Sequence, residues 1–418
     1  MPKKTTPVLI YLPGESTPVP AGVFNWTPET RVGEFVYDSN YLQSSKAISL
    51  DPMGLRFKRS VVKEARQDGI FGIFRDAGPD AWGRDQLYRE LGDLDEFELL
   101  LKGPADGVGN VSFGETPRPI QAYSLAELDD VSRGFPPEST QIANAINPTT
   151  SMGGAKPKLL VQDAGAFWIA KFPEKGDPVR FLAANEHVML EMARDCGVDA
   201  ASSRLHSLPD GRQILLVRRF DLALDKLEVT RKGFASAYTV LGLGNPHEDA
   251  RKKSYLRFAE EAMRWTGQQY GKAIWQRLVF NAMVGNIDDH PRNHALIRDI
   301  NGWQLSPAFD IVASERKDQV ALSMRFHNDG AIATPETLLA SACLFGIPAE
   351  EAITEMCHMA STILETWQSR FKKIGADAVN IEKLEGAFKM ARQVLAHSFD
   401  IAQLREIRRS TRYRLSAR

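Results

Sequence analysis

The sequence predicts an α+β fold made of a mostly β module (residues 1–130), a mixed α/β lobe (131–228) and an all-helical carboxy-terminal lobe (229–418). Three observations support this prediction. Short apolar and aromatic runs between Pro and Gly fill the first hundred residues, as strands and turns do. A hairpin, a helix and a second hairpin follow from about residue 150. Beyond about residue 230, apolar residues recur at helical spacing.

Composition limits the class of protein. The chain has 418 residues, of which 43% are hydrophobic and 25% charged, which is typical of a globular protein with two or three domains. The net charge of -1 gives no overall attraction to nucleic acid or membrane, so a nucleic-acid contact would need a local patch or a partner. Three cysteines without a C-x-x-C pair favour a reducing cytoplasm over a disulfide framework or structural zinc. No run approaches the roughly 20 apolar residues that a membrane helix needs. The apolar run from Val8 to Leu12 is too short for the core of a signal peptide. We therefore expect no membrane contact.

In the first module, "TPVLIYL", "PAGVFNWT" and "GEFVYDSNYL" predict short strands. Pro79 and Asp80 then indicate the start of a helix, and Gly92 indicates its end. In the second module, runs over 158–162 and 167–172 flank the turn Asp163-Ala164-Gly165 and predict a hairpin.

A helix over "AANEHVMLEMARDCGV" should stop at Gly197, and two further strands should flank the Pro-Asp-Gly turn at 209–211. The third module carries helical periodicity, for example in "KSYLRFAEEAMRWTG" and "AEEAITEMCHMASTILETWQSRFKKIG".

The stretch "GNIDDHPRNHALI" (285–297) places Asp288 and Asn293 five residues apart. Protein kinases use this D-x-x-x-x-N spacing, in which the aspartate accepts the proton of the attacking hydroxyl and the asparagine holds magnesium. The alternative is a polar turn between helices, since Asp, Asn and Pro favour turns whatever the function.

Seventeen residues after Asn293, Asp310 ends the strand-like run of "LSPAFDIVAS". A carboxylate and an amide, completed by ATP phosphates and water, would suit magnesium, which prefers hard oxygen ligands. The alternative is that Asp310 caps a helix starting at Ile311.

Lys171 lies in the apolar strand "WIAKFP", and Glu186 opens the next helix. A strand lysine can bind ATP phosphates and pair with a glutamate of the following helix. The alternative is a lysine that keeps an edge strand soluble.

Just before the hairpin, "TTSMGGAKPKLLV" combines small residues, which let backbone N–H groups approach phosphate, with two lysines. The alternative is a flexible linker. These features follow one another in the order found in a two-lobed kinase. The order is a phosphate loop, a strand lysine, a helix glutamate, a catalytic Asp with an Asn five residues later, and a metal-binding Asp.

With these motifs, the chain resembles the HipA family of serine/threonine kinases, the toxins of type II toxin–antitoxin pairs. The resemblance spans nearly the whole chain and rests on "GIFRDAGPDAWGR" (72–84), "SMGGAKPK", "NIDDHPRNHAL" and "LSPAFDIV". It implies a two-lobed protein-kinase-like fold.

The resemblance also implies site residues. Asp288 would be the general base, with Asp289 as its neighbour, and Asn293 would complete the catalytic pair. Asn293 and Asp310 would hold Mg2+, Ser151 would be autophosphorylated, and Glu186 would pair with Lys171. The expected ATP-binding residues are Gly153, Gly154, Ala155, Lys156, Pro157, Lys158, Lys171, Arg218, Arg219, Phe220, His290, Pro291, Arg292, Asn293, Phe309 and Asp310.

By the same resemblance, the substrate would be a translation component such as an aminoacyl-tRNA synthetase. The partner would be a helix-turn-helix antitoxin, HipB, which brings contact with operator DNA. Arg218 stands where some members have a hinge glutamate, which should tune nucleotide affinity. Two alternatives stay open, a kinase-fold co-repressor that acts mainly by binding the antitoxin and a small-molecule kinase.

Overall fold

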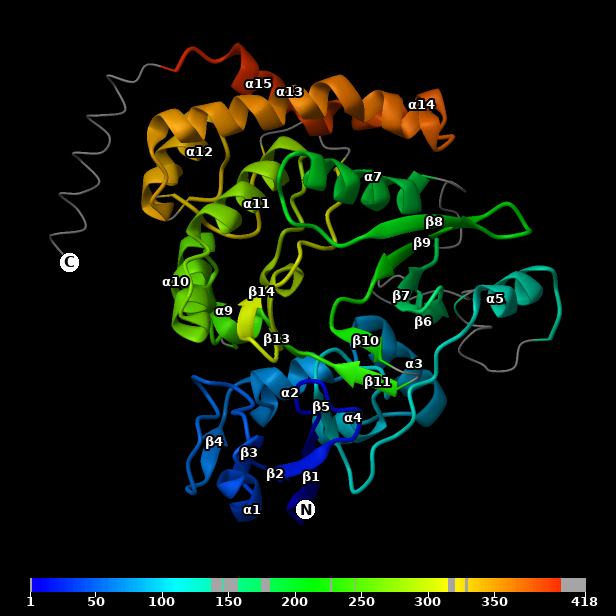
Figure 1. The fold of residues 1–418 in the computed structure, drawn as a ribbon, viewed down its shortest axis with the longest axis vertical. Coiled ribbons are helices and arrows are strands. Elements are labelled where there is room, and N and C mark those ends of the chain that lie inside the picture. Colours follow the sequence, from blue (N-terminus) through cyan, green and yellow to red (C-terminus); the bar gives the residue numbers. More distant parts are fainter. Residues whose placement is uncertain are drawn as a thin grey trace, which may run out of the picture. The chain divides into compact units, whose positions relative to one another are not determined.

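The computed structural model describes residues 2–136, 145, 157–173, 181–225, 228–244, 246–314, 320–327 and 330–399 (Figure 1). Contacts divide the chain into two compact units. Unit 1 consists of Met1–Val179, His206–Asp249 and Ala295–Ser306, and unit 2 consists of Arg180–Leu205, Ala250–His294 and Pro307–Arg418. The predicted boundaries of the three modules stay a prediction.

The amino-terminal part of unit 1 is an antiparallel sheet with the strand order β4-β3-β2-β1-β5. Its strands are β1 (Lys4–Ile10), β2 (Val19–Thr27), β3 (Val32–Tyr37), β4 (Val62–Glu64) and β5 (Val111–Phe113). Short helical segments accompany it, namely α1 (Ser39–Gln43), η1 (Gln67–Gly69), α2 (Gly72–Ala77), α3 (Ala81–Leu91) and α4 (Glu96–Lys102). The next helix, α5 (Leu125–Ser132), packs instead against the strand that follows it. The core of this part is aromatic, because Phe24 and Phe35 meet Phe74 edge to face at ring-centroid distances of 5.3 and 5.6 Å.

Helix α3 has the limits that the sequence predicts. The Asp80 carboxylate caps its start by accepting a hydrogen bond from the Gly83 N–H at 2.9 Å. Gly92 ends it with a φ of 79°, a left-handed backbone conformation that glycine adopts without strain.

The predicted hairpins are confirmed. Strands β6 (Lys158–Asp163) and β7 (Ala166–Lys171) pair antiparallel around a turn at Ala164 and Gly165. With β8 (Ser203–Ser207) and β9 (Gln213–Arg218) they form a sheet in the order β6-β7-β9-β8. Two smaller sheets follow, β10 (Leu222–Asp225) with β11 (Glu228–Arg231), and β12 (Gly233–Ser236) with β13 (Ala295–Asp299) and β14 (Gly302–Leu305).

The helices α8 (Ala237–Val240) and α9 (Pro246–Lys252) lead to unit 2. Its helical segments are α7 (Phe181–Asp195), α10 (Tyr255–Thr266), α11 (Gly271–Met283), η2 (Pro291–Asn293), α12 (Pro335–Ala342), η3 (Cys343–Phe345), α13 (Ala349–Lys373), α14 (Ala378–Lys383), η4 (Leu384–Phe388) and α15 (Lys389–Ala396). The long helix α13 packs against α7 and α15 (Figure 1). Trp367 and Phe388 meet in this interface with ring centroids 4.5 Å apart.

The structure confirms a mixed α/β fold with a helical carboxy-terminal region, and it corrects one detail. Strands β12, β13 and β14 lie within residues 229–305, which the sequence predicts to be helical. Strand β13 escaped prediction because Ala295, Leu296 and Ile297 are all buried, so the alternation that identifies a half-exposed strand is missing.

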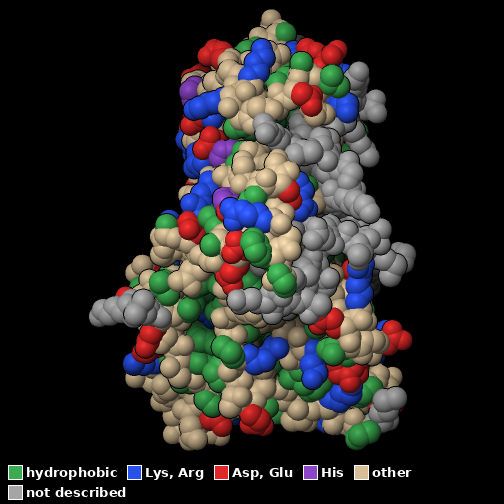
Figure 2. Space-filling model, turned by 90° about the vertical axis from the view of Figure 1, so that its right-hand side faces the viewer, with side chains coloured by type: hydrophobic (Ala, Val, Ile, Leu, Met, Phe, Trp, Pro, Cys, Tyr) green, Lys and Arg blue, Asp and Glu red, His purple; other side chains and the backbone are tan. Residues whose placement is uncertain are grey.

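The surface agrees with the near-zero net charge. Acidic and basic side chains intermingle on the face shown in Figure 2. Cys196, Cys343 and Cys357 are free thiols. Across the described residues, none of the helices has both the length and the apolarity needed to cross a bilayer.

Candidate functional site

The polar stretch Asn286–His294 follows the end of α11. That helix is buried along most of its length and includes the fully buried Trp275 and Phe280, so it gives the loop a fixed starting point. At Gly285 the backbone turns with a φ of 64°, and a Cβ there would lie 2.9 Å from the Ala387 carbonyl oxygen. Glycine is therefore required where the loop leaves the helix.

The two neighbouring aspartates have opposite environments. The Asp288 side chain is 80% exposed, whereas Asp289 is 1% exposed. One carboxylate oxygen of Asp289 accepts a hydrogen bond from Tyr255 Oη at 2.6 Å, and the other accepts one from the Ser323 N–H at 2.6 Å. Burial raises the pKa of Asp289 to about 6. Of the two, Asp288 is therefore the carboxylate that a ligand can reach.

Asn293 contacts the backbone of Asp288 directly. Its Nδ2 donates a hydrogen bond to the Asp288 carbonyl oxygen at 2.8 Å, and its own N–H donates to the His290 carbonyl at 2.8 Å. Because the amide nitrogen is used in this way, the amide orientation is fixed and Oδ1 remains as its acceptor atom. Four polar residues of the stretch are buried, namely Asn286, Asp289, Asn293 and His294. Their burial does not fit the alternative of a solvated polar turn.

The two histidines of the loop also differ. His290 is 41% exposed, and its Nε2 lies 3.9 Å from Asp288 Oδ1. His294 is buried beside the Tyr255 ring, with ring centroids 5.2 Å apart. Burial lowers the pKa of His294 to about 3, so its imidazole is neutral near pH 7. We assign His294 to the packing of the loop.

Asp310 lies in an extended segment that α7 holds in place. The Asn185 side chain donates to the Ala313 carbonyl and accepts from the Ala313 N–H, both at 2.9 Å. Residues 311–314 form no helix, so the helix-cap alternative for Asp310 is wrong. Asp310 itself has a φ of 57°, a left-handed conformation that is uncommon outside glycine and often marks functional sites. Phe309 beside it is half-buried.

Lys171 ends strand β7, which lies between β6 and β9 in its sheet. The edge-strand alternative for this lysine is therefore wrong. Lys158 lies opposite Lys171 in the β6–β7 register, and its Nζ is 2.6 Å from Asp80 Oδ2. Glu186 is buried in α7 of unit 2, whereas Lys171 belongs to unit 1, so their ion pair stays a prediction.

Several predicted phosphate-loop residues cannot be placed. Ser151, Gly153, Gly154, Ala155 and Lys156 lie outside the described residues. Pro157 precedes β6, and its carbonyl accepts a hydrogen bond from the Phe172 N–H at 3.0 Å. In the η2 segment, Pro291 is buried and Arg292 is exposed.

The predicted hinge residues follow strand β9. Arg218 is exposed, and Phe220 stacks on Phe234 with ring centroids 6.5 Å apart. Arg219 is buried, and its guanidinium binds both oxygens of Asp221 at 2.6 and 2.7 Å. Burial alone would raise the pKa of Asp221, but the Arg219 charge holds it below its usual value. Since the Arg219 side chain is used within unit 1, contact with adenine would fall to the backbone.

The sequence did not indicate the residues that support these motifs. Asn185, Tyr255, Asn281, Asn286 and Ser323 are spread over helices and loops. The available signal was weak: polar residues such as Asn185 and Asn281 stand among the apolar positions of their helices, where an unsatisfied amide would be costly.

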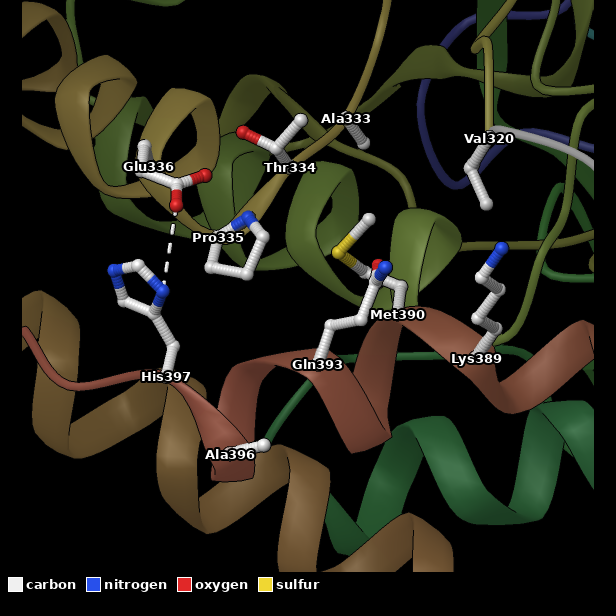
Figure 3. Close-up of a pocket in the computed structure, with 10 residues that line it drawn as sticks. All are labelled: Val320, Ala333, Thr334, Pro335, Glu336, Lys389, Met390, Gln393, Ala396 and His397. Carbon is white, nitrogen blue, oxygen red and sulfur yellow. Dashed lines mark ion pairs between the residues drawn. The ribbon is translucent and has the colours of Figure 1, made fainter.

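A cavity of about 540 Å³ opens between α12 and α15 (Figure 3). An ion pair between His397 and Glu336, 3.3 Å apart, lies at one side, and Lys389 lies at the other. Of the predicted site residues that the structure describes, none lines this cavity.

Comparison with known families decides the relationship. Residues 16–114 match the HipA N-terminal domain, and residues 150–367, about half of the chain, match the HipA-like C-terminal domain. The chain belongs to the HipA family. In this chain, the loops with Asp288, Asn293 and Asp310 fall in the carboxy-terminal match, whereas β2 to β5 fall in the amino-terminal one.

A solved relative shows the same fold. The chain aligns with the complex of HipA, HipB and operator DNA from the Shewanella oneidensis MR-1 toxin–antitoxin system, with a TM-score of 0.67 and 18% identity. The alignment covers 93% of this chain and 96% of that one. Y4dM of Sinorhizobium fredii, named as a candidate kinase, is 28% identical over 248 residues. That match covers 54% of this chain and 59% of Y4dM, so it spans less than two thirds of the relative.

Proposed function

We propose that this HipA-family protein is a Mg-ATP-dependent serine/threonine protein kinase that acts as the toxin of a toxin–antitoxin pair. One observation carries the proposal. Asp288 presents an exposed carboxylate while its backbone carbonyl is held by the Asn293 amide. A general base must be accessible to the acceptor and fixed in position, and Asp288 meets both requirements.

In the proposed reaction, the oxygen of an acceptor hydroxyl attacks the γ-phosphorus of ATP. The new P–O bond forms as the bond to the β-phosphate oxygen breaks, and ADP leaves with that electron pair. The hydroxyl proton passes to the Asp288 carboxylate. Asn293 keeps the Asp288 backbone in place during the transfer through its 2.8 Å hydrogen bond.

The residues present suit magnesium. Asn293 Oδ1 and the Asp310 carboxylate are hard oxygen ligands, and the amide of Asn293 is already oriented by its bond to Asp288. Within the described residues, no group of three or more His, Cys, Asp or Glu could hold a metal, so further ligands would come from phosphate and water. When bound, Mg2+ would neutralise phosphate charge.

The regulatory and partner proposals rest on the family. The Shewanella oneidensis HipA was solved with HipB and operator DNA, which supports a helix-turn-helix antitoxin and operator DNA as partners here. The name of the Sinorhizobium fredii relative supports kinase activity. We further propose that Ser151 is autophosphorylated, which would place nearly two negative charges beside the ATP phosphates. As the protein substrate we propose a translation component such as an aminoacyl-tRNA synthetase.

The proposal is tested by phosphoproteomics after induced expression of the wild type and of Asp288→Gln. We expect new phosphosites and growth arrest with the wild type only. Asp130→Gln is a matched control, because Asp130 is also exposed but lies on α5. Phosphotransfer retained by Asp288→Gln would refute the base assignment. A wild type that adds no phosphate but represses an operator with its antitoxin would favour the co-repressor alternative.

A further inference from the structure

Residues 320–333 form a small hairpin beyond Asp310, described here except for 328 and 329. The Leu322 N–H donates to the Ala331 carbonyl at 2.9 Å, and the Ala333 N–H donates to the Val320 carbonyl at 2.8 Å. Along its first arm, Leu322, Met324 and Phe326 are buried, and Ser323 between them is exposed. One face of the arm therefore joins the core of unit 2, and the other faces outward.

This hairpin is fastened to the loop on both sides of Asp288. The Ser323 N–H donates to Asp289 Oδ1 at 2.6 Å, and Ser323 Oγ donates to the Ile287 carbonyl at 2.9 Å. A single hairpin residue thus binds the residue before Asp288 and the residue after it. Because the Asp288 side chain is 80% exposed, packing does little to fix it, and its position depends on these backbone attachments.

A buried chain of hydrogen bonds extends the attachment into the helices. Tyr255 Oη donates to Asp289 Oδ2 at 2.6 Å and accepts from Asn281 Nδ2 at 2.9 Å. Asn281 Oδ1 in turn accepts from Asn286 Nδ2 at 3.1 Å. Tyr255 also holds the hairpin itself, since its N–H donates to the Arg325 carbonyl at 2.9 Å.

The charge of Asp289 makes this arrangement costly. Burying a carboxylate is unfavourable unless its oxygens are well bonded, and both oxygens of Asp289 are bonded. An apolar residue could fill the same space without the penalty. Asp289 is therefore suited to a task that packing alone does not perform: its carboxylate joins the loop to both Tyr255 and the hairpin, beside the Ser323 Oγ bond to Ile287.

We propose that Asp289 and Tyr255 are positioning residues for Asp288, and that they act by attaching the hairpin and helix α10 to the loop that carries it. This inference rests on the proposed kinase function. Proton acceptance needs the base within hydrogen-bond reach of the hydroxyl, and a displacement of about 1 Å can cost roughly a hundredfold in rate. Neither residue would contact ATP or magnesium.

The substitution Asp289→Asn affects the two hydrogen bonds of the carboxylate, from Tyr255 Oη and from the Ser323 N–H, in different ways. With its one oxygen toward the Ser323 N–H, an asparagine presents its amide group to Tyr255 Oη, which already accepts from Asn281 Nδ2 and would lose the acceptor for its own proton. The attachment to Tyr255 is therefore weakened while side-chain volume is kept. Tyr255→Phe removes the same bond from the opposite side, so the double variant should be no worse than the more damaged single variant.

Three measurements on the full chain test the proposal. We expect Asp289→Asn and Tyr255→Phe to lower autophosphorylation, followed with labelled ATP, by at least roughly tenfold. Calorimetry should give an affinity for Mg-ATP within about twofold of wild type, because neither residue meets the nucleotide. Hydrogen exchange of the amides in 320–327 should become faster by about tenfold or more.

Two control variants separate positioning from general damage. Ser341→Ala removes a buried hydroxyl that donates to the Leu338 carbonyl and accepts from Trp275 Nε1 in the same unit, and it should change neither autophosphorylation nor exchange in 320–327. Ser323→Ala removes only the bond to the Ile287 carbonyl from an exposed side chain. It should give a smaller loss of turnover, and it carries the test if Asp289→Asn does not fold.

The outcomes are distinct. Full turnover in Asp289→Asn despite faster exchange would overturn the positioning role, and unchanged exchange would overturn the attachment itself. Parallel loss of Mg-ATP affinity and turnover would indicate general damage and would also overturn the proposal. If the wild type transfers no phosphate to any acceptor, the proposed function fails first; an active wild type with an equally active Asp289→Asn refutes this inference alone.

Discussion

Replacing Asp289 by asparagine should change how the stability of unit 2 depends on pH. Burial raises the pKa of this carboxyl from 3.8 to about 6, and the side chain is 1% exposed. Between these two values the native state holds a proton that the unfolded chain has released, so the free energy of unfolding falls as pH rises through the window. A shift of about two units at 1.36 kcal/mol each corresponds to about 3 kcal/mol.

Asparagine does not titrate, so this contribution disappears in the variant. The free energy of unfolding of Asp289→Asn minus that of the wild type should therefore rise by about 3 kcal/mol between about pH 4 and about pH 7. Urea unfolding at several pH values, followed by tryptophan fluorescence and circular dichroism, measures this difference. His294, whose lowered pKa acts in the opposite direction, is present in both proteins and cancels. A difference that stays constant with pH would show that Asp289 does not titrate in this range, and the reasoning would be refuted.

Three further predictions concern ligands, modification and stability. Asp310→Asn should weaken Mg-ATP binding by roughly tenfold or more in calorimetry, because it removes a charged metal ligand; unchanged affinity would contradict the metal role. Mass spectrometry of active protein should find phosphate at Ser151 and none in the Asp288→Gln variant, and phosphate only at other sites would count against autoinhibition. Asp221→Ala should lower the free energy of unfolding by about 3–5 kcal/mol, because it removes the carboxylate that accepts two hydrogen bonds from the buried Arg219 guanidinium. A thermal melt within a degree or so of wild type would show that water replaces the carboxylate there.

What could be predicted from the sequence depends on residues close to one another in the chain. Asp80 and Gly92 marked the ends of α3 because caps act within one helical turn. The β6–β7 hairpin followed from its turn residues. The five-residue spacing of Asp288 and Asn293 likewise predicted a local relation, and the structure shows their direct contact.

The supporting contacts could not be predicted because they join distant segments. Asp289 binds Tyr255 and Ser323, each 34 residues away along the chain. Nothing in the stretch "NIDDHPRN" shows which aspartate is buried, since both have the same chemistry and stand side by side. Burial is decided by what packs over the loop, and those residues come from α10 and the hairpin 320–333.

The left-handed backbone at Asp310 has a consequence for which residues that position can accept. For most L-residues this conformation costs roughly 1–2 kcal/mol, and only Gly, Asn and Asp adopt it routinely. This backbone therefore favours Gly, Asn or Asp at 310 before any ligand is considered, and a need for negative charge would favour aspartate. Asparagine keeps the backbone preference and nearly the shape of aspartate, so Asp310→Asn removes the charge and one acceptor oxygen without imposing a new backbone preference.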